Sequence, residues 1–296
     1  MPRRLLAALA AVVTALTLAG CGALRLESED PPAQSAGPEE QLRQEHATQT
    51  WRLAELARSA AATDPDHAAV LESVTQDALV QLDALGGVWQ PAGRHLEPAT
   101  PRGDASAVVD LLAASTAAAA QSAIDGDGDL AGMFAGIAVS RSLRTDQLAS
   151  ALGTEPDAVE PALPDAVDPA TSADLVRTLD ALGQAWEVVA ARSEDPASAS
   201  AEAASWRDQA QQLAVLAGVA DTPEDPRAVS YDLAGDLDET IADLRADLVP
   251  CWLAQVATTT GEDRRAVIDL ALAAARDAGL GEPGAEIPAI LGTSVA

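Results

Sequence analysis

The chain has no lysine, one phenylalanine, one tyrosine, two cysteines and three histidines among its 296 residues. So few cysteines and histidines leave no zinc-ligand spacing, and they provide no disulfide framework. The sequence also contains no G-x-S-x-G motif, phosphate-binding loop or dinucleotide fingerprint. We therefore predict a protein that is not an enzyme and carries no cofactor.

Charge of one sign is also scarce. All 18 basic residues are arginine, and they are outnumbered by 46 acidic residues, which gives a formal net charge of −28. A polyanion of this kind repels nucleic acid and anionic headgroups. We therefore expect no nucleic-acid partner unless a divalent cation intervenes.

The N-terminus has the pattern of a lipoprotein signal peptide, residues 1–20. Arg3 and Arg4 precede an apolar segment, Leu5 to Leu18, that is too short for a committed membrane span. The sequence Leu18-Ala19-Gly20-Cys21 then reads as a lipobox. We predict cleavage before Cys21, a lipid on that cysteine, and anchoring at the extracytoplasmic face of the cell membrane. An ordinary cleaved signal peptide is the alternative.

The rest of the chain is rich in alanine and leucine and is interrupted mainly by proline and glycine, which predicts an all-α protein. We expect two helical bundles. The predicted organisation is a flexible tether over 21–38, an N-terminal helical bundle over 39–152, a Pro- and Asp-rich linker over 153–171 and a C-terminal four-helix bundle over 172–296.

Apolar spacing locates the individual helices. In the first half we expect helices near 39–62, 65–85, 104–125 and 129–151. In the second half, apolar seams run from Leu175 to Val189, Trp206 to Leu216, Leu237 to Cys251 and Val267 to Ala274, with a kink or interruption at Pro250. Gly132-x-x-x-Gly136 predicts a place where a neighbouring helix approaches closely.

The chain resembles the ferritin-like lipoproteins of high-GC actinobacteria that carry a C-terminal domain of unknown function. The segments that carry this resemblance, besides the lipobox, are QLDALGGVW, TLDALGQAWEVVAARSE, the Trp206 helix, AVSYDL, DLDETIADLRADLVPCWLAQVA and GAEIPAILG, in this order. The resemblance implies that the second bundle is a ferritin-like four-helix bundle in an envelope lipoprotein. It implies no established activity.

Iron binding by such a bundle would need a Glu from each of two helices and a Glu-x-x-His pair from each of the other two. The second half has no histidine, and the first half has no such pair. An antiparallel pair of helices could still bring Glu45 or His46 near His67 or Glu72. Glu45, His46 and Glu72 are therefore weak metal candidates.

The stretch Asp125-Gly126-Asp127-Gly128-Asp129 resembles the opening of an EF-hand calcium loop. Position 6 of that loop would be Leu130 instead of glycine, and position 12 would be Gly136 instead of glutamate. We interpret the stretch as a turn between two helices, with Asp129 capping the second. A partial calcium site formed by Asp125, Asp127 and Asp129 is the alternative.

A pocket in the second half is a further expectation. Asp180 and Glu187 are one heptad apart beside Trp186 and could line a polar pocket. An apolar pocket between the two bundles, lined by Trp186, Trp206 or Trp252, would instead indicate a carrier. Cys251 lies in an apolar pattern and is interpreted as a buried small hydrophobe.

Together these features predict a lipid-anchored envelope protein with a non-enzymatic binding or scaffolding role and an unidentified protein partner. Its contact with the membrane would be the lipid on Cys21. The alternative is a metal-handling ferritin-like protein with a degenerate carboxylate site for iron or calcium. An apolar bundle interior would favour the first, and four or more converging carboxylates or imidazoles would favour the second.

Overall fold

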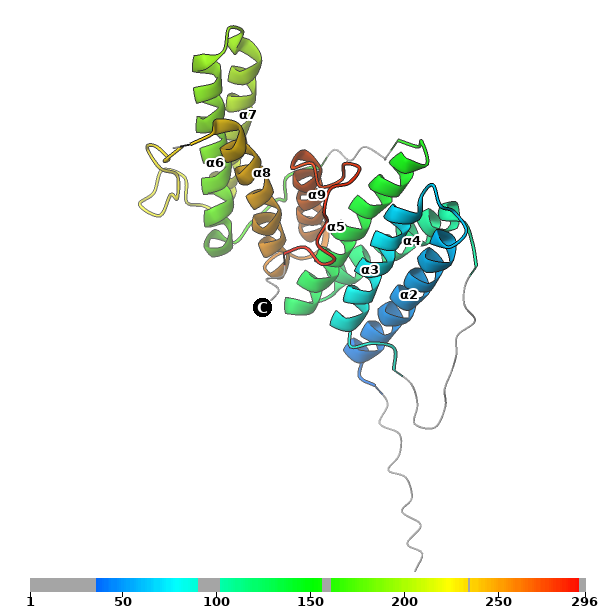
Figure 1. The fold of residues 1–296 in the computed structure, drawn as a ribbon. Coiled ribbons are helices and arrows are strands. Elements are labelled where there is room, and N and C mark those ends of the chain that lie inside the picture. Colours follow the sequence, from blue (N-terminus) through cyan, green and yellow to red (C-terminus); the bar gives the residue numbers. More distant parts are fainter. Residues whose placement is uncertain (1–35, 90–101, 156–160, 234, 293–296) are drawn as a thin grey trace, which may run out of the picture. The chain divides into compact units, whose positions relative to one another are not determined.

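The computed structural model describes residues 36–89, 102–155, 161–233 and 235–292 (Figure 1). These residues form helices without any strand, which confirms the all-α prediction. The α-helices are α2 (Pro38–Ala61), α3 (Ala68–Ala84), α4 (Ala105–Asp125), α5 (Gly128–Ala151), α6 (Pro169–Arg192), α7 (Pro196–Leu216), α8 (Leu237–Ala254) and α9 (Gly261–Asp277), with a 3-10 turn, η1 (Gln255–Ala257), after α8.

The chain divides into two compact units, residues 1–41 and residues 42–296. Only 36–41 are described in the first unit, and they include the first turn of α2. The predicted signal peptide, lipobox and Cys21 lie outside the described residues, as does most of the tether.

Aspartate caps explain where several helices begin. Asp168 accepts hydrogen bonds from the backbone nitrogens of Ala170 and Thr171, and Pro169 occupies the first helical position, where a missing N–H costs nothing. This cap starts α6 three residues before the predicted boundary at 172. Asp104, Asp195 and Asp236 cap α4, α7 and α8 in the same way.

The helices of the first half enclose a small apolar cluster. It joins α2, α3 and α4 and reaches α5 at one residue; its buried members are Leu53, Ala54, Leu56, Ala57, Ala60, Leu71, Val74, Ala78, Ala105, Val108, Leu112 and Leu148. Among the described helices, α4 alone is long and apolar enough to cross a membrane by composition, a test that core helices also pass. It packs along α5.

Helix α5 differs from the others because it is buried on nearly every side. Fifteen of its 24 residues are buried, including the charged residues Arg141, Arg144 and Asp146. A helix that is enclosed on all faces must have neighbours on all faces. Helices α3 and α4 supply them on one side, and α8, η1 and α9 supply them on the other.

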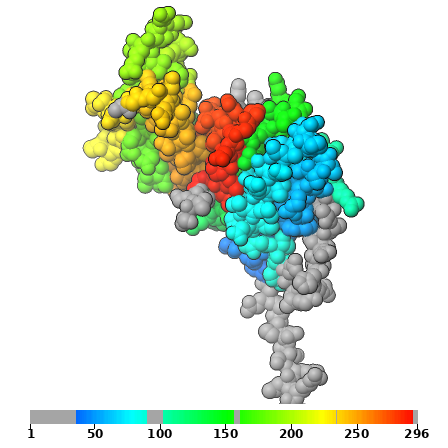
Figure 2. Space-filling model, viewed as in Figure 1, coloured from blue at the N-terminus to red at the C-terminus, as the bar shows by residue number. Residues whose placement is uncertain are grey.

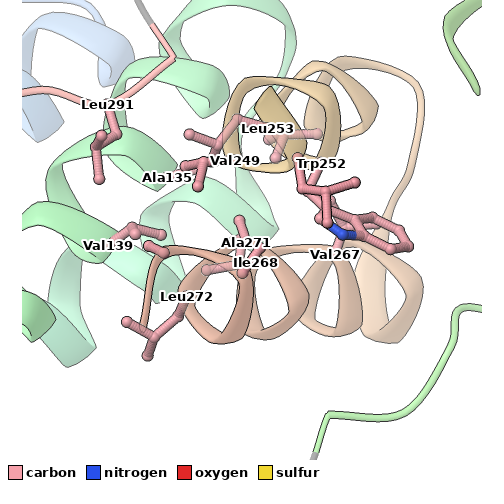
Figure 3. Close-up of a cluster of buried hydrophobic side chains, with 14 of the residues drawn as sticks. Ala135, Val139, Val249, Trp252, Leu253, Val267, Ile268, Ala271, Leu272 and Leu291 are labelled. Atoms are coloured by element: carbon pink, nitrogen blue, oxygen red, sulfur yellow. The ribbon is translucent and has the colours of Figure 1, made fainter. Parts of the chain in front are cut away.

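A second, larger apolar cluster therefore runs from the first half into the second. Figure 3 shows its centre, where Ala135 and Val139 of α5 meet side chains of α8 and α9, with Leu291 nearby. The labelled partners are Val249, Trp252, Leu253, Val267, Ile268, Ala271 and Leu272. The two halves thus bury apolar surface against each other.

The chain that follows α9, residues 278–292, is called the C-terminal segment here. It lies against the first half. The side-chain amide of Gln81 in α3 donates to the backbone oxygen of Ala289 over 2.7 Å, and Figure 2 shows this segment in red beside α3 in cyan. A Cβ atom at Gly136 would overlap the backbone oxygen of Leu291, whereas one at Gly132 would meet nothing within 4 Å. The close neighbour at Gly136 is therefore the C-terminal segment, not the expected helix.

In the second half, α6 packs against α7 and α8, and α8 packs against α9. Helix α8 continues through Pro250 to Ala254. Trp206, Leu213, Ile241, Leu248 and Val267 are buried, as their seams predict. The seams thus identify which faces of these helices are enclosed.

Candidate functional site

A pocket lined by Trp206 and Trp252, the tryptophan pocket, lies among the helices of the second half. It has a volume of about 480 Å³, and α6, α7, α8, α9 and residues 161–163 all contribute to its walls. Its lining consists of Pro161, Leu163, Leu179, Trp206, Gln209, Gln212, Leu248, Trp252, Leu270, Ala273, Ala274 and Asp277. The walls are thus mainly apolar and include two indole rings.

Both tryptophans are held firmly in place. Trp206 is 8% exposed, and its indole Nε1 donates to the Glu202 carboxylate over 3.0 Å, one turn earlier on α7. Trp252 is 2% exposed. It follows Leu248 by one turn of α8, so Leu248 and Trp252 lie on the same helix face, which lines the pocket. Rings fixed in this way offer a preformed apolar surface to a ligand.

The polar part of the lining consists of Gln209, Gln212 and Asp277. Asp277 is the last residue of α9 and the only charged side chain among the described residues of the lining. Partial burial raises the pKa of its carboxyl, the positive charge of Arg245 lowers that pKa, and Glu202 raises it. This carboxylate therefore lies in a mixed electrostatic environment at the exposed rim of an apolar cavity.

A second group of side chains lies beside the pocket. The Arg245 guanidinium is 5.6 Å from the ring centre of Trp186, and its Nη2 lies 3.5 Å from the Glu202 carboxylate. The buried Nε1 of Trp186 and the buried Nε of Arg245 have no hydrogen-bond partner among the described residues. Trp186 thus stacks with an arginine and does not line the tryptophan pocket.

Asp180 and Glu187 are brought together, but by an arginine. Arg207 of α7 donates to Asp180 over 2.5 Å and to Glu187 over 3.1 and 3.2 Å. Its side chain passes so close to Gly183 that a Cβ there would lie 2.8 Å from two of its carbons. Both carboxylates bind this arginine, and neither belongs to the described lining of the tryptophan pocket.

Asp180 also holds the loop between α7 and α8. The Tyr231 hydroxyl donates to Asp180 over 2.8 Å, and burial together with this hydrogen bond raises the pKa of Tyr231 to about 12. Gln184 forms two further hydrogen bonds, with the backbone nitrogen and oxygen of Tyr231. The loop is thus attached to α6.

The weak metal candidates of the first half do not converge. His46 is buried, stacks against Phe134 with ring centres 4.3 Å apart, and lies 2.8 Å from the Ser122 hydroxyl. Burial, and then the charge of Arg141, lowers its pKa to about 4. Glu45 and Glu72, in contrast, are exposed. His46 is therefore part of the bundle interior.

The aspartate-rich turn is likewise arranged around protein groups. Asp127 occupies the N-cap position of α5, while Asp129 lies in the first turn, so the prediction that Asp129 is the cap is wrong. The Asp125 carboxylate accepts from Gln121 over 2.8 Å. The carbonyl oxygens at the end of α4 face the buried Arg264, which donates to Ala123, Ile124 and Gly126.

Across the part of the chain that is described, no three histidine, cysteine, aspartate or glutamate side chains gather as a metal site would require. Cys251 is half-buried, and burial raises the pKa of its thiol, which suits a small core residue better than a nucleophile. Cys21, the predicted lipid-attachment residue, lies outside the described residues.

A larger cavity of about 770 Å³ lies between α3, α5, α8 and the C-terminal segment. It contains the ion pair of Asp77 and Arg144, whose charged atoms are 2.5 Å apart. Arg144 also donates to Gln147 and to the carbonyl oxygen of Ile287. The Asp77 and Arg144 side chains are therefore already paired with protein partners. For this reason we take the tryptophan pocket as the better candidate site.

No protein-family model matches the chain, and neither the curated proteins nor the solved structures include a significant match.

Trp206 and Trp252 were expected in a pocket between the two bundles, whereas they line one within the second half, and Asp277, Gln209 and Gln212 were not expected in it. Asp277 follows Leu270 by seven residues, which places both on one face of α9. Gln209 and Gln212 follow Trp206 by three and six residues. The helical spacing was therefore a usable signal.

Proposed function

We propose that this protein is a lipid-anchored, extracytoplasmic envelope protein that binds a small ligand in the tryptophan pocket without transforming it. The single observation that carries the proposal is the pocket itself. Its volume of about 480 Å³ lies within the range of small-molecule sites, and its walls are apolar and aromatic with a few polar groups. The lipobox at Cys21 supports the cellular location.

The chemistry of the lining supports binding over catalysis. Asp277 is the only ionisable side chain among the twelve described residues of the lining, so these twelve form no acid–base pair and no nucleophile–base pair. A metal-handling role would need several converging carboxylates or imidazoles, and the described residues do not bring even three together. We therefore retain the binding role over the metal-handling alternative.

Binding of the neutral dye Nile red tests the pocket. We expect its fluorescence to rise on addition of the protein, and we expect Ala273→Leu to reduce this signal because the larger side chain occupies the cavity. Ala204→Leu is the matched control, since Ala204 is exposed on α7 and lies outside the lining. Equal binding by both variants would contradict the proposed site.

Fractionation of the native host membrane tests the predicted anchor. We expect the full chain in the membrane fraction and the Cys21→Ser variant in the soluble extracytoplasmic fraction, because the serine cannot accept the lipid. Membrane retention of Cys21→Ser would contradict lipid anchoring through this residue.

A further inference from the structure

We propose that the ligand of the tryptophan pocket is an amphipathic organic cation, with its apolar body among Trp206, Trp252 and the leucines and its positive head beside Asp277. This inference rests on the proposed binding function and adds the chemical class of the ligand. It depends on the charges in and around the pocket.

Among the described residues, the three charged side chains linked to the pocket have a negative sum. Asp277 lines it, Glu202 is hydrogen-bonded to Trp206, and Arg245 interacts with Glu202. Two carboxylates and one guanidinium give a local formal charge of −1. Arg245 forms its ion pair with Glu202, and no salt bridge among the described residues includes Asp277, although the charge of Arg245 acts on it. A bound cation would form one with Asp277.

The end of α9 adds to this preference. Ala273, Ala274 and Asp277 belong to the last turn of this helix, and all three line the pocket. The C-terminal end of a helix carries partial negative charge from its carbonyl groups, which favours cations there. The backbone dipoles and the Asp277 carboxylate therefore act in the same direction at one part of the rim.

The aromatic walls suit the same class of ligand. The indole rings of Trp206 and Trp252 give the apolar body of this ligand an aromatic wall, while its positive head lies at Asp277. The two side chains are 8% and 2% exposed, so protein atoms cover most of each ring and only a small part of it faces the pocket.

The charge of the whole chain favours the approach of such a ligand. With a formal charge of −28, the protein attracts cations from solution and repels anions. An anionic amphiphile would meet both this field and the Asp277 carboxylate. A neutral amphiphile would gain only from the apolar walls.

The test uses three probes that share one alkyl chain: decyltrimethylammonium, decanol and decanoate. Each displaces Nile red from the purified protein below its micelle concentration. We expect decyltrimethylammonium to bind about tenfold more tightly than decanol, a difference of about 1.4 kcal/mol, and decanoate to bind most weakly. Added salt should reduce the advantage of the cation.

Asp277→Asn removes the charge while preserving the shape of the side chain. We expect it to abolish most of the tenfold advantage of decyltrimethylammonium over decanol, with both probes measured on the same variant. Asp110→Asn is the matched control, because Asp110 is exposed on α4 and does not line the pocket. Unchanged selectivity in Asp277→Asn would overturn the assignment of the cation to this carboxylate.

The outcomes separate this inference from the proposed function. If the three probes bind equally well and Ala273→Leu blocks all of them, the pocket binds ligands but has no preference for cations. If Nile red and the probes do not bind, or bind equally to Ala273→Leu, the proposed binding function fails as well.

Discussion

Arg141 combines full burial with neutral partners. It is 2% exposed, and its guanidinium donates to the Gln81 side chain, the Thr50 hydroxyl and the carbonyl oxygen of Ser115. Burial lowers its pKa to about 10, which still leaves it charged at neutral pH. Neutral acceptors therefore replace water around this cation.

We expect Arg141→Met to lower the free energy of unfolding by about 2–4 kcal/mol, because Gln81 and Thr50 lose their buried donor. Denaturant unfolding measures the change. Arg177→Met is the control: Arg177 is half-exposed on α6 and pairs with Asp174, so its loss should cost less than about 1 kcal/mol. Similar losses in both variants would contradict the role assigned to the buried contacts.

His46 should make the protein sensitive to acid. Its pKa is lowered from 6.5 to about 4 in the folded state, so protonation favours the unfolded chain. Its contribution to stability is fully present above about pH 6.5 and is lost progressively as the pH falls toward 4. The loss should approach about 3 kcal/mol at pH 4.

The variant His46→Gln removes this titration but keeps a polar group near Ser122. Between pH 7 and pH 4, we expect the wild type to lose about 3 kcal/mol more unfolding free energy than this variant loses. The difference cancels the titration of the carboxylates, which both proteins share. A difference that is constant with pH would refute the assignment.

At the scale of single elements, glycines on one helix provide an internal comparison. Gly136 of α5 contacts the C-terminal segment, and Leu291 donates to its carbonyl oxygen over 3.4 Å. Gly132, one turn earlier, has no neighbour within 4 Å of its Cβ position. The same substitution should therefore have opposite effects at the two positions.

We expect Gly136→Ala to lower the free energy of unfolding by about 1–3 kcal/mol, because the new methyl group displaces the backbone at Leu291. Gly132→Ala should raise it by about 0.5–1 kcal/mol, because alanine is the better helix former. Thermal unfolding of the pair is the measurement. Stabilisation by both substitutions would mean that the C-terminal segment does not pack at Gly136.

The helices were predictable because their signals are local. The aspartate before α4 and the glycine after α7 (Gly218, φ 70°) mark helix ends that any alanine-rich helix needs. The burial of α5 on nearly all sides was not predictable from its sequence, because its polar interior, such as Arg141 and Gln147, is stabilised by residues far away in the chain.

The tryptophan pocket also combines features that were predictable from the sequence with features that were not. Trp206 lies in a predicted apolar seam and Trp252 directly follows one, but Trp186 also lies in such a seam and is absent from the described lining. The functions of Asp180 and Glu187 could not be read from their heptad spacing, since Arg207 comes from another helix and its reach across Gly183 is a tertiary property. Spacing places residues on a face but does not identify the residue opposite.

At the scale of the whole molecule, Arg264 links the two halves. It lies in the first turns of α9 and is 2% exposed. Its guanidinium donates to Thr259 over 2.7 Å and to Ala123 over 2.8 Å, and it also contacts the carbonyl oxygens of Ile124 and Gly126. A cation at the carbonyl end of α4 stabilises that helix. One side chain therefore supports α4 from α9.

We expect Arg264→Met to lower the free energy of unfolding by about 2–4 kcal/mol, because buried carbonyl groups lose a charged donor. Arg265→Met is the control, because Arg265, the residue next to Arg264, is half-exposed and pairs weakly with Glu262. Because α5 of the first half packs against α8 and α9 of the second, the loss should be shared by both halves. Hydrogen exchange should show the most protected amides of α3 and of α6 losing the same free energy of protection in Arg264→Met. A loss confined to α8 and α9 would mean that the halves unfold independently, and the common apolar cluster would then not couple them.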